Sequence, residues 1–286
     1  MRFTVDEAKC TLCGACILTC PTDMVREKRG AIKISRVACI GCGHCMAICP
    51  AGAVALEEID YEGDFRPAAD SRVDADALLG LMKSRRTVRT YRPEPLTEEQ
   101  LGALLEAARY APTAANCQCQ EFLVVKGAEA RAQLVGGIMA YYREYAEVLA
   151  DREHPERLEA FQTGSGEMHE HILAAVPALV KNVEAGRDRL FFDAPTVIII
   201  HGSEDEVLPE AACAFAALQT CLMAEALGLG SCITAYASLA LQALPELRAR
   251  TGIPERHQVY YVLTVGNTDE RYPLIPPRRP ARVRVV

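Results

Sequence analysis

CTLCGACILTCP (residues 10–21) and CIGCGHCMAICP (residues 39–50) are two copies of one sequence pattern, and together they hold eight of the 13 cysteines of the chain. Each copy has three cysteines separated by two residues and a fourth cysteine directly before a proline. This duplication predicts a compact amino-terminal module, to which we assign residues 1–59.

The cysteine spacing indicates iron–sulfur clusters. Cys-x2-Cys-x2-Cys-x3-Cys-Pro is typical of 4Fe–4S binding, and in modules with two clusters the fourth cysteine of each run binds the other cluster. Zinc is the alternative, but zinc ribbons use two pairs of cysteines per site and not three evenly spaced cysteines plus a fourth. The predicted ligands of the two 4Fe–4S clusters are Cys10, Cys13, Cys16 and Cys49 for the first, and Cys39, Cys42, Cys45 and Cys20 for the second.

The module resembles the dicluster bacterial ferredoxins over about its first 55 residues, and this resemblance implies one-electron transfer at low potential. Residues 60–73 are acidic, contain glycine and proline and lack a steady apolar period, so we predict a linker there. The chain continues to residue 286, and we expect a catalytic partner of the module in that remainder.

The composition argues against several functional classes. A net charge of −7 leaves no basic face of the kind that nucleic acid attracts. The chain has no run of about 18 uncharged apolar residues, so no membrane span is predicted. Its start, MRFTVDEAKC, lacks the basic-then-apolar order of a signal peptide. We therefore expect a soluble, cytoplasmic protein.

From residue 74 onward, the pattern predicts helices that alternate with short apolar strands. Thr97 and Gln100 have the spacing of a capping box. Residues 211–227 are apolar almost all round, which predicts a fully buried helix whose burial another subunit could complete. The predicted fold class of residues 74–286 is α+β, with a mixed sheet sandwiched between helices. Buried strands are predicted at residues 122–125, 197–200 and 259–265.

Residues 138–175 are predicted to be a polar helical insertion. It carries the aromatic residues Tyr141, Tyr142, Tyr145 and Phe161, and its helical pattern is interrupted at residues 163–166. A substrate lid and a helical excursion packed on the surface both agree with this pattern.

The stretch MKSRRTVRTYRPEP (residues 82–95) gathers cationic side chains at a predicted helix end. Arg85, Arg86, Thr87 and Arg89 supply guanidinium groups and a hydroxyl, which suit a phosphate and the electron-rich edge of a ring. Such a run by itself is more often a solvated basic face, so the motifs further along the chain decide its meaning.

Three motifs follow in order: APTAANCQCQEF (residues 111–122), EALGLGSCITAY (225–236) and the closing VGNTDERYPLIPPRRPARVRVV (265–286). With the arginine motif they resemble the nitroreductase family of FMN flavoproteins. That family shows R-R/H-S/T-x-R/K, then A-P-S/T-x-x-N-x-Q-P-W, then G-L-G-S/T-C, and finally basic residues near a proline. The resemblance covers residues 74–286 and implies an FMN-dependent enzyme with its flavin at a homodimer interface.

The resemblance also implies roles for individual residues. Arg85, Thr87 and Arg89 would bind the FMN phosphate, the ribityl chain and the N1/O2 edge of the ring. There Arg89 would stabilise the anionic reduced flavin. At the carboxyl terminus, the spacing before Pro280 favours Arg278 as the phosphate contact. The implied FMN-binding residues are Arg85, Arg86, Thr87, Arg89, Asn116, Gln118, Ile233, Thr234, Ala235, and Arg278 or Arg279.

One position departs from the family pattern. Cys119 and Gln120 stand where the family has Pro-Trp, and the chain contains no tryptophan. This departure concerns the stacking of a substrate and leaves FMN binding unaffected. Cys117 and Cys119 are interpreted as small buried residues, with a redox role as the alternative.

The predicted activity is that of an iron–sulfur flavoprotein oxidoreductase. An external donor, a ferredoxin-like protein or NAD(P)H, would reduce the clusters, and the clusters would reduce FMN. No catalytic side chain is predicted, because reduced flavin N5 can deliver hydride itself. The acceptor implied by resemblance is a small nitroaromatic or quinone-like molecule. An electron relay to a partner protein, and a ferredoxin-fed ene-reductase or dehalogenase, are the alternatives.

Overall fold

The computed structural model describes residues 3–56, 72–151, 153–154, 156–157 and 174–286. The chain divides into two compact units. Unit 1 is Met1–Arg72 with Ala114–Cys117, and unit 2 is Val73–Thr113 with Gln118–Val286. Most of the predicted linker, residues 60–71, lies outside the described residues.

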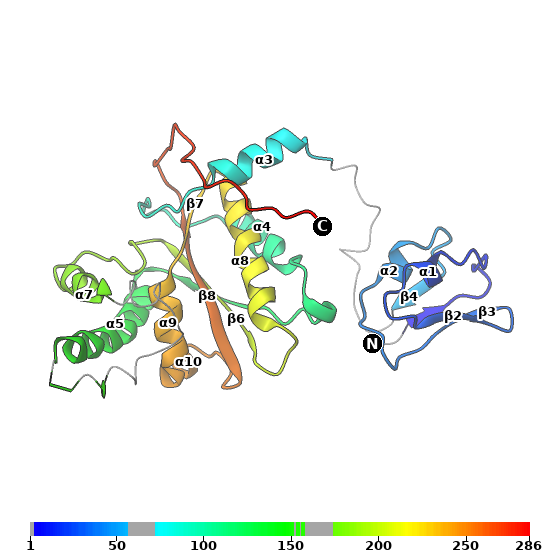
Figure 1. The fold of residues 1–286 in the computed structure, drawn as a ribbon, viewed down its shortest axis with the longest axis horizontal. Helices are drawn as coiled ribbons and strands as arrows, with labels where there is room; N and C mark the ends of the chain where they lie inside the picture. The colour runs from blue at the N-terminus through cyan, green and yellow to red at the C-terminus, as the bar shows by residue number, and fades with distance from the viewer. Residues whose placement is uncertain (1–2, 57–71, 152, 155, 158–173) are drawn as a thin grey trace. The chain divides into compact units, whose positions relative to one another are not determined.

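Unit 1 contains the duplicated cysteine motif and is built from two pairs of antiparallel strands and two one-turn helices (Figure 1). Strand β1 pairs antiparallel with β4, and β2 pairs antiparallel with β3. A small hydrophobic core lies between them, and the buried cysteines Cys16 and Cys45 belong to it. The elements are β1 (Phe3–Val5), α1 (Ala15–Leu18), β2 (Val25–Lys28), β3 (Ala31–Ile34), α2 (His44–Ala47) and β4 (Val54–Leu56).

Each copy of the motif turns sharply into its short helix at a glycine. Gly14 precedes α1 with a φ of 76°, and Gly43 precedes α2 with a φ of 72°. Residues other than glycine rarely adopt this left-handed backbone conformation, because their Cβ atom comes too close to the neighbouring carbonyl oxygen. The two glycines therefore let both cysteine loops fold in the same way.

Unit 2 is organised around a four-stranded sheet with the order β5-β6-β8-β7, in which all neighbouring strands are antiparallel. One parallel bridge, between Thr87 and Ser231, makes the sheet mixed, as predicted. The predicted strands are confirmed, although each is longer than the apolar run that indicated it. The strands are β5 (Glu121–Lys126), β6 (Thr196–Ser203), β7 (Gly230–Ile233) and β8 (His257–Gly266).

Helices cover both faces of this sheet, which confirms the predicted sandwich (Figure 1). Helices α4 and α8 pack on one face, around the buried residues Leu104 and Ile198. Helices α5, α7 and α9 pack on the other face, around Ile138 and Ile199. The helices are α3 (Ala75–Ser84), α4 (Glu98–Arg109), α5 (Ala128–Ala150), α7 (Val176–Glu184), α8 (Pro209–Ala226), α9 (Ala235–Ala243) and α10 (Pro245–Arg250), with a short 3-10 turn, η1 (Ala114–Asn116).

The start of α4 confirms the predicted capping box. The Thr97 hydroxyl accepts a hydrogen bond from the Gln100 backbone N–H at 3.1 Å. In return, the Gln100 side-chain oxygen accepts from the Thr97 backbone N–H at 2.9 Å. Two N–H groups that the helix leaves unpaired are thus satisfied by local sequence alone.

Helix α8 differs from its prediction. Its small residues, such as Ala216 and Ala224, are buried against α4 and the sheet. Phe215 and Leu218 are 46% and 52% exposed, so the prediction of a fully buried helix is wrong for the single chain. The outward side of α8 presents large apolar side chains to the surface.

Part of the predicted insertion at residues 138–175 belongs to the core. Residues 138–150 complete α5, and Tyr142 is fully buried with its hydroxyl donating to the Tyr236 carbonyl oxygen at 2.6 Å. The described part of the segment therefore packs as a helix. Phe161 and residues 158–173 of the predicted insertion, which the lid interpretation includes, lie outside the described residues.

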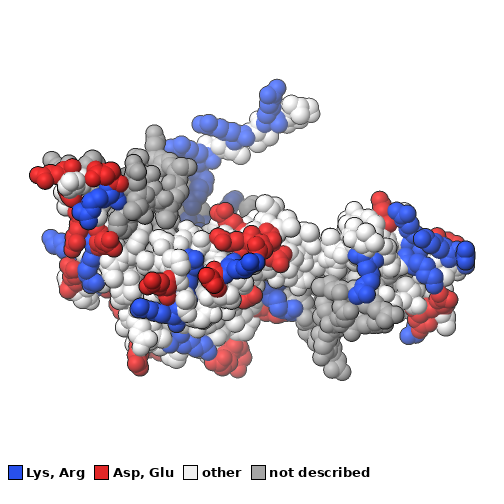
Figure 2. Space-filling model, turned by 90° about the horizontal axis from the view of Figure 1, so that it is seen from below, with Lys and Arg blue, Asp and Glu red and all other residues white. Residues whose placement is uncertain are grey.

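Figure 2 shows acidic and basic side chains interspersed over the face that it displays, and the net charge of the chain is −7. Within the described residues, no helix combines the length and the apolar character needed to cross a membrane.

Candidate cofactor-binding sites

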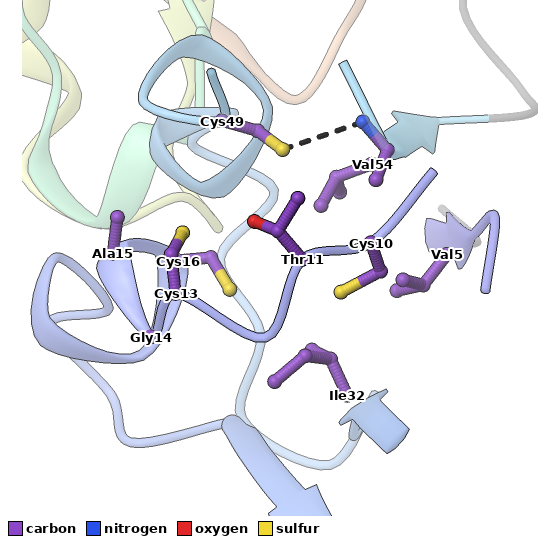
Figure 3. Close-up of a pocket in the computed structure, with 11 residues that line it drawn as sticks. Val5, Cys10, Thr11, Cys13, Gly14, Ala15, Cys16, Ile32, Cys49 and Val54 are labelled. Carbon is purple, nitrogen blue, oxygen red and sulfur yellow. Dashed lines mark hydrogen bonds between the residues drawn. The ribbon is translucent and has the colours of Figure 1, made fainter. Parts of the chain in front are cut away.

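The first cavity of unit 1 is lined by the four cysteines predicted to hold one cluster (Figure 3). Cys10, Cys13 and Cys16 come from the first motif, and Cys49 comes from the end of the second. Apolar side chains, among them Ile32, surround the thiols. The fold thus joins the two ends of the duplicated sequence around one small cavity.

The second cavity repeats this arrangement with the motifs exchanged. It is lined by Cys39, Cys42 and Cys45 from the second motif and by Cys20 from the first. His44 also lines it, beside a complete set of four thiols. Both copies of the motif therefore gather three of their own thiols and one thiol of the other copy around a cavity.

The two exchanged cysteines accept equivalent backbone hydrogen bonds. The Met24 N–H donates to the Cys20 sulfur at 3.3 Å, and the Ala53 N–H donates to the Cys49 sulfur at 3.3 Å. Each donor lies four residues after its cysteine. Such bonds stabilise a thiolate and orient it as a ligand.

The buried thiols need a positively charged partner before they ionise together. Burial, together with the negative charges of Cys42 and Cys39, raises the pKa of Cys45 to about 11. Burial also raises the pKa of Cys16, and Cys49 and Cys10 add to that shift. Iron supplies the positive charge that holds closely spaced sulfurs as thiolates. The donor set therefore fits two 4Fe–4S clusters.

In unit 2, the arginine motif (residues 82–95) lies beside β7. This strand is part of the third motif, EALGLGSCITAY (residues 225–236). Thr87 forms a parallel bridge with Ser231, and the Val88 N–H donates to the Ser231 carbonyl oxygen at 2.9 Å. A Cβ atom on Gly230 would lie 2.6 Å from a Val88 methyl carbon. Only glycine at position 230 permits this close approach of Val88 to β7, so Gly230 has a packing role.

Side chains along segment 85–89 divide into two sets, because successive side chains of an extended segment point to opposite sides. Val88 is buried against the sheet, and Arg86 turns back to the end of α3. There the Arg86 guanidinium donates to the carbonyl oxygens of Ser84, at 3.1 Å, and of Lys83. Arg85, Thr87 and Arg89 occupy the alternate positions.

Arg85 and Arg89 lie close to buried or half-buried side chains near β7. The Arg89 guanidinium lies 5.8 Å from the centre of the Phe192 ring, within the range of a cation–π contact. Burial raises the pKa of Cys232, and the charge of Arg89 opposes that shift. Burial likewise raises the pKa of Cys221, with Arg85 among the opposing groups. Arg85 and Arg89 therefore both lie near the edge of the sheet at β7.

The third motif presents backbone at the point where β7 enters α9. Ile233 and Ala235 are exposed, whereas Thr234 is buried and its hydroxyl donates to the Leu190 carbonyl oxygen at 3.2 Å. No side chain of the described residues caps the start of α9. The predicted contact of Ile233, Thr234 and Ala235 with the flavin through their backbone stays a prediction.

The motif APTAANCQCQEF (residues 111–122), which follows the arginine motif in the chain, has an unusual backbone. Ala115, Asn116 and Gln118 have φ values of 49°, 55° and 48°, and none of them is glycine. Left-handed residues of this kind are costly and cluster at functional segments. Asn116 belongs to the stretch grouped with unit 1, and Gln118, in unit 2, is exposed with its backbone N–H donating to the Thr113 hydroxyl at 3.1 Å.

The closing basic residues are not assembled with the arginine motif in this single chain. Arg278 and Arg279 lie in the exposed segment that follows β8. In the part of the chain that the structure describes, neither guanidinium makes a hydrogen bond or ion pair to segment 85–89. Their predicted phosphate contact stays a prediction.

Phe192 and Ser231 were not anticipated from the sequence. Phe192 lies 103 residues after Arg89, which it contacts. No short sequence motif can indicate a contact over that separation. Ser231 lies inside the third motif, but its role is a backbone bridge to Thr87, and sequence patterns do not reveal which strand edges pair across a fold.

A helix-covered sheet, joined in one chain to a unit with paired four-cysteine cavities, defines a class of iron–sulfur redox proteins. Residues 82–267 match the Nitroreductase family, and the chain belongs to that family. Residues 2–65 match the 4Fe-4S dicluster domain. The two matches correspond to the two units.

Known proteins similar to this chain agree with these matches. A nitrobenzene nitroreductase of Ectopseudomonas oleovorans is 24% identical over 202 residues, which are 68% of this chain and 87% of that protein. A Streptomyces coelicolor protein provisionally named NADH dehydrogenase/NAD(P)H nitroreductase is 30% identical over 115 residues, or 40% of this chain. The match spans about half, 53%, of the length of that relative.

Solved structures show the same fold for unit 2. A nitroreductase with bound FMN from Desulfitobacterium hafniense has a TM-score of 0.53 and 24% identity, covering 73% of this chain and 97% of that chain. A nitroreductase with bound FMN from Bacteroides fragilis has a TM-score of 0.51 and 23% identity, with the same coverage. At these identities the likeness establishes the fold alone.

Proposed function

We propose that this chain is an FMN-dependent iron–sulfur oxidoreductase that reduces a small organic acceptor, nitroaromatic or quinone-like. FMN can take up electrons singly and deliver them in pairs, whereas a 4Fe–4S cluster carries them one at a time. A chain with both cofactors can therefore convert one-electron input into two-electron reduction. Solved relatives with bound FMN support the assignment of the flavin.

The observation that carries this proposal is the pairing of segment 85–89 with β7. It brings Arg85, Thr87 and Arg89 to the same sheet edge as the exposed backbone around Ile233 and Ala235. Guanidinium groups suit the phosphate and the electron-rich ring edge, and the first N–H groups of α9 can donate to ring heteroatoms. Arg86 is already bound to carbonyl oxygens of α3, so we assign it a structural role.

Each residue set has a defined task in this proposal. The eight thiolates hold the two clusters, and the N–H donors to Cys20 and Cys49 orient the exchanged ligands. Arg85 and Thr87 anchor the polar tail of FMN, and Arg89 stabilises negative charge on its ring. No described side chain is needed as an acid or base for hydride delivery.

We also propose a homodimer whose interface includes α3 and α8. Exposed apolar side chains on these helices include Leu79, Met82, Phe215 and Leu218. A second copy would bury them, and a cofactor site at the edge of β7 would then be completed by the partner. Light scattering should give about twice the 31.2 kDa mass of one chain, and Leu218→Lys should shift that mass toward the monomer.

The decisive experiment is anaerobic purification followed by cofactor analysis and rapid kinetics. We expect about eight irons and about one FMN per chain. One or two zinc ions without iron would refute the cluster assignment. Stopped-flow mixing with NADH, NADPH and reduced ferredoxin should then identify the donor, and a panel of nitro compounds and quinones should reoxidise the protein catalytically. Electron exchange with a protein acceptor alone would favour the relay alternative.

A further inference from the structure

Three side chains able to bind metal lie together in unit 2, outside the cofactor sites. They are Glu121 at the start of β5, His201 in β6 and His257 at the start of β8, and their ligand atoms all lie within 4.8 Å of one another. We propose that this group is a binding site for a divalent transition-metal ion of the Zn²⁺ class. The site is additional to the redox function proposed above.

The distances between the ligand atoms are close to those of a zinc site. Nδ1 of His201 lies 3.0 Å from Nδ1 of His257, and the latter lies 3.9 Å from Oε2 of Glu121. In tetrahedral zinc, with bonds of about 2.0–2.1 Å, neighbouring ligand atoms are about 3.3–3.4 Å apart. The observed distances fall on both sides of that value, so small side-chain rotations bring the three atoms onto one ion.

Burial and exposure in the group suit capture of an ion from solvent. His201 is 5% exposed and the His257 side chain 13%, whereas the Glu121 carboxylate is 58% exposed. An ion could thus arrive from solvent at the exposed Glu121 side chain and be held against the two buried or nearly buried imidazoles.

Sheet register supplies one half of the arrangement. Glu121 and His201 are direct partners across the antiparallel strands β5 and β6. Partner residues of neighbouring strands project from the same face of a sheet. The carboxylate and the first imidazole are therefore neighbours as long as this register is kept.

A β-bulge supplies the other half. Ile200 pairs with Tyr261, but the next residue, His201, pairs with Val259, so Tyr260 is an extra residue in β8. A bulge of this kind reverses which side chains beyond it face each side of the sheet, and it re-aims residues near functional sites.

The packing shows that this reversal brings the second histidine to the site. Val262 and Val259 both belong to the core beside α5, although they lie three residues apart. Strict alternation would have placed Val259 and His257 on the opposite face. Because of the bulge, His257 shares a face with His201, and their rings lie 5.2 Å apart.

The group is also stable without an ion. One neutral imidazole can donate its Nδ1–H to the other at the observed 3.0 Å. Metal binding requires that donor to hold its proton on Nε2, so that both Nδ1 atoms offer lone pairs. Imidazole and carboxylate ligands suit Zn²⁺, and three protein ligands leave one position for water.

The test is anaerobic equilibrium dialysis of the purified holoprotein against Zn²⁺, with zinc and iron measured per chain. His257→Gln should weaken zinc binding by more than about 100-fold, since loss of a ligand exceeds the 10–100-fold effect of losing an outer partner. Glu121→Gln alters an exposed side chain that no core packing depends on, and it should weaken binding by at least about 10-fold. Unchanged iron content and melting temperature without zinc would show that both variants are folded.

His154→Gln is the matched control. His154 lies 3.2 Å from Glu156, which makes another histidine–carboxylate pair, but both are exposed and no second imidazole joins them in the described residues. This variant should bind zinc as the natural chain does. X-ray absorption at the zinc edge should show nitrogen and oxygen neighbours at about 2.0–2.2 Å.

Two results would overturn the proposal. One is zinc binding by His257→Gln and Glu121→Gln that equals binding by the natural chain, including the case in which none of them binds zinc. The other is a sulfur neighbour at about 2.3 Å, which would assign the bound zinc to cysteines.

Discussion

The two units differ in what their cofactor residues contribute to folding. In unit 1, Cys16 and Cys45 are both predicted cluster ligands and members of a small core. Unit 2 has two large cores of aliphatic and aromatic residues, and neither contains Arg85, Thr87 or Arg89. Val88 is the buried residue of that segment. Small domains with little apolar surface need metals or cross-links to fold. We therefore expect the clusters to stabilise the fold of unit 1, whereas unit 2 should fold without its cofactor.

The largest expected effect is the loss of cluster ligands. Cys39→Ala combined with Cys42→Ala should lower iron from about eight to about four or fewer per chain, because the second site keeps only two thiolates. Hydrogen exchange should then become fast throughout unit 1, while unit 2 stays protected.

Cys213→Ala is the control for that experiment, since Cys213 is buried in unit 2 and lines neither cluster cavity. Its iron content should not change. Full iron in the double variant, or loss of protection in unit 2 as well, would remove the contrast between the units.

A core truncation in unit 2 should have the converse effect. Leu104 is fully buried in α4, and Leu104→Ala should destabilise unit 2 by about 2–5 kcal/mol through lost burial and a cavity. Urea unfolding followed by hydrogen exchange would measure the loss, and the cluster absorbance should persist.

The same helix offers a control of opposite sign. Gly102 lies on the exposed side of α4, and a Cβ atom added there meets nothing within 4 Å. Gly102→Ala should therefore stabilise unit 2 by about 0.5–1 kcal/mol. Equal shifts in both units for either variant would contradict their independence.

The flavin residues should affect binding without affecting folding. Arg85→Ala and Arg89→Ala should each weaken FMN binding by about 10–100-fold, because each removes a charge-assisted hydrogen bond worth about 1.5–3 kcal/mol. Arg86→Ala should retain FMN, since Arg86 binds carbonyl oxygens of α3. Flavin fluorescence on dilution would rank the three variants, and equal losses would disprove the division of segment 85–89.

A last expected effect separates the two cysteine motifs within unit 1. Leu12 has a φ of 53° at the position where the second motif has Gly41, with a φ of 63°. A left-handed leucine costs about 1–2 kcal/mol, so Leu12→Gly should stabilise unit 1 and Gly41→Leu should destabilise it by similar amounts. The rate of cluster loss in chelator would report both changes, and a faster loss in Leu12→Gly would show that Leu12 packs against the cluster.

Local features of this protein were determined by the sequence alone. The cysteine spacing grouped the thiols of each cavity, because three ligands on one tight loop are set by neighbouring residues. The capping box at Thr97 and the apolar strand runs were equally local. Family motifs indicated the fold of unit 2 and the residues of its proposed flavin site.

Only the tertiary structure decided which distant segments meet. The structure pairs Thr87 with Ser231 and directs the Arg86 guanidinium to the end of α3, which is why we assign FMN binding to Arg85 and Arg89 and not to Arg86. The bulge in β8 joined His201 to His257, which no sequence spacing suggests. Such juxtapositions depend on strand register and on close approaches such as that at Gly230, and these are properties of the whole fold.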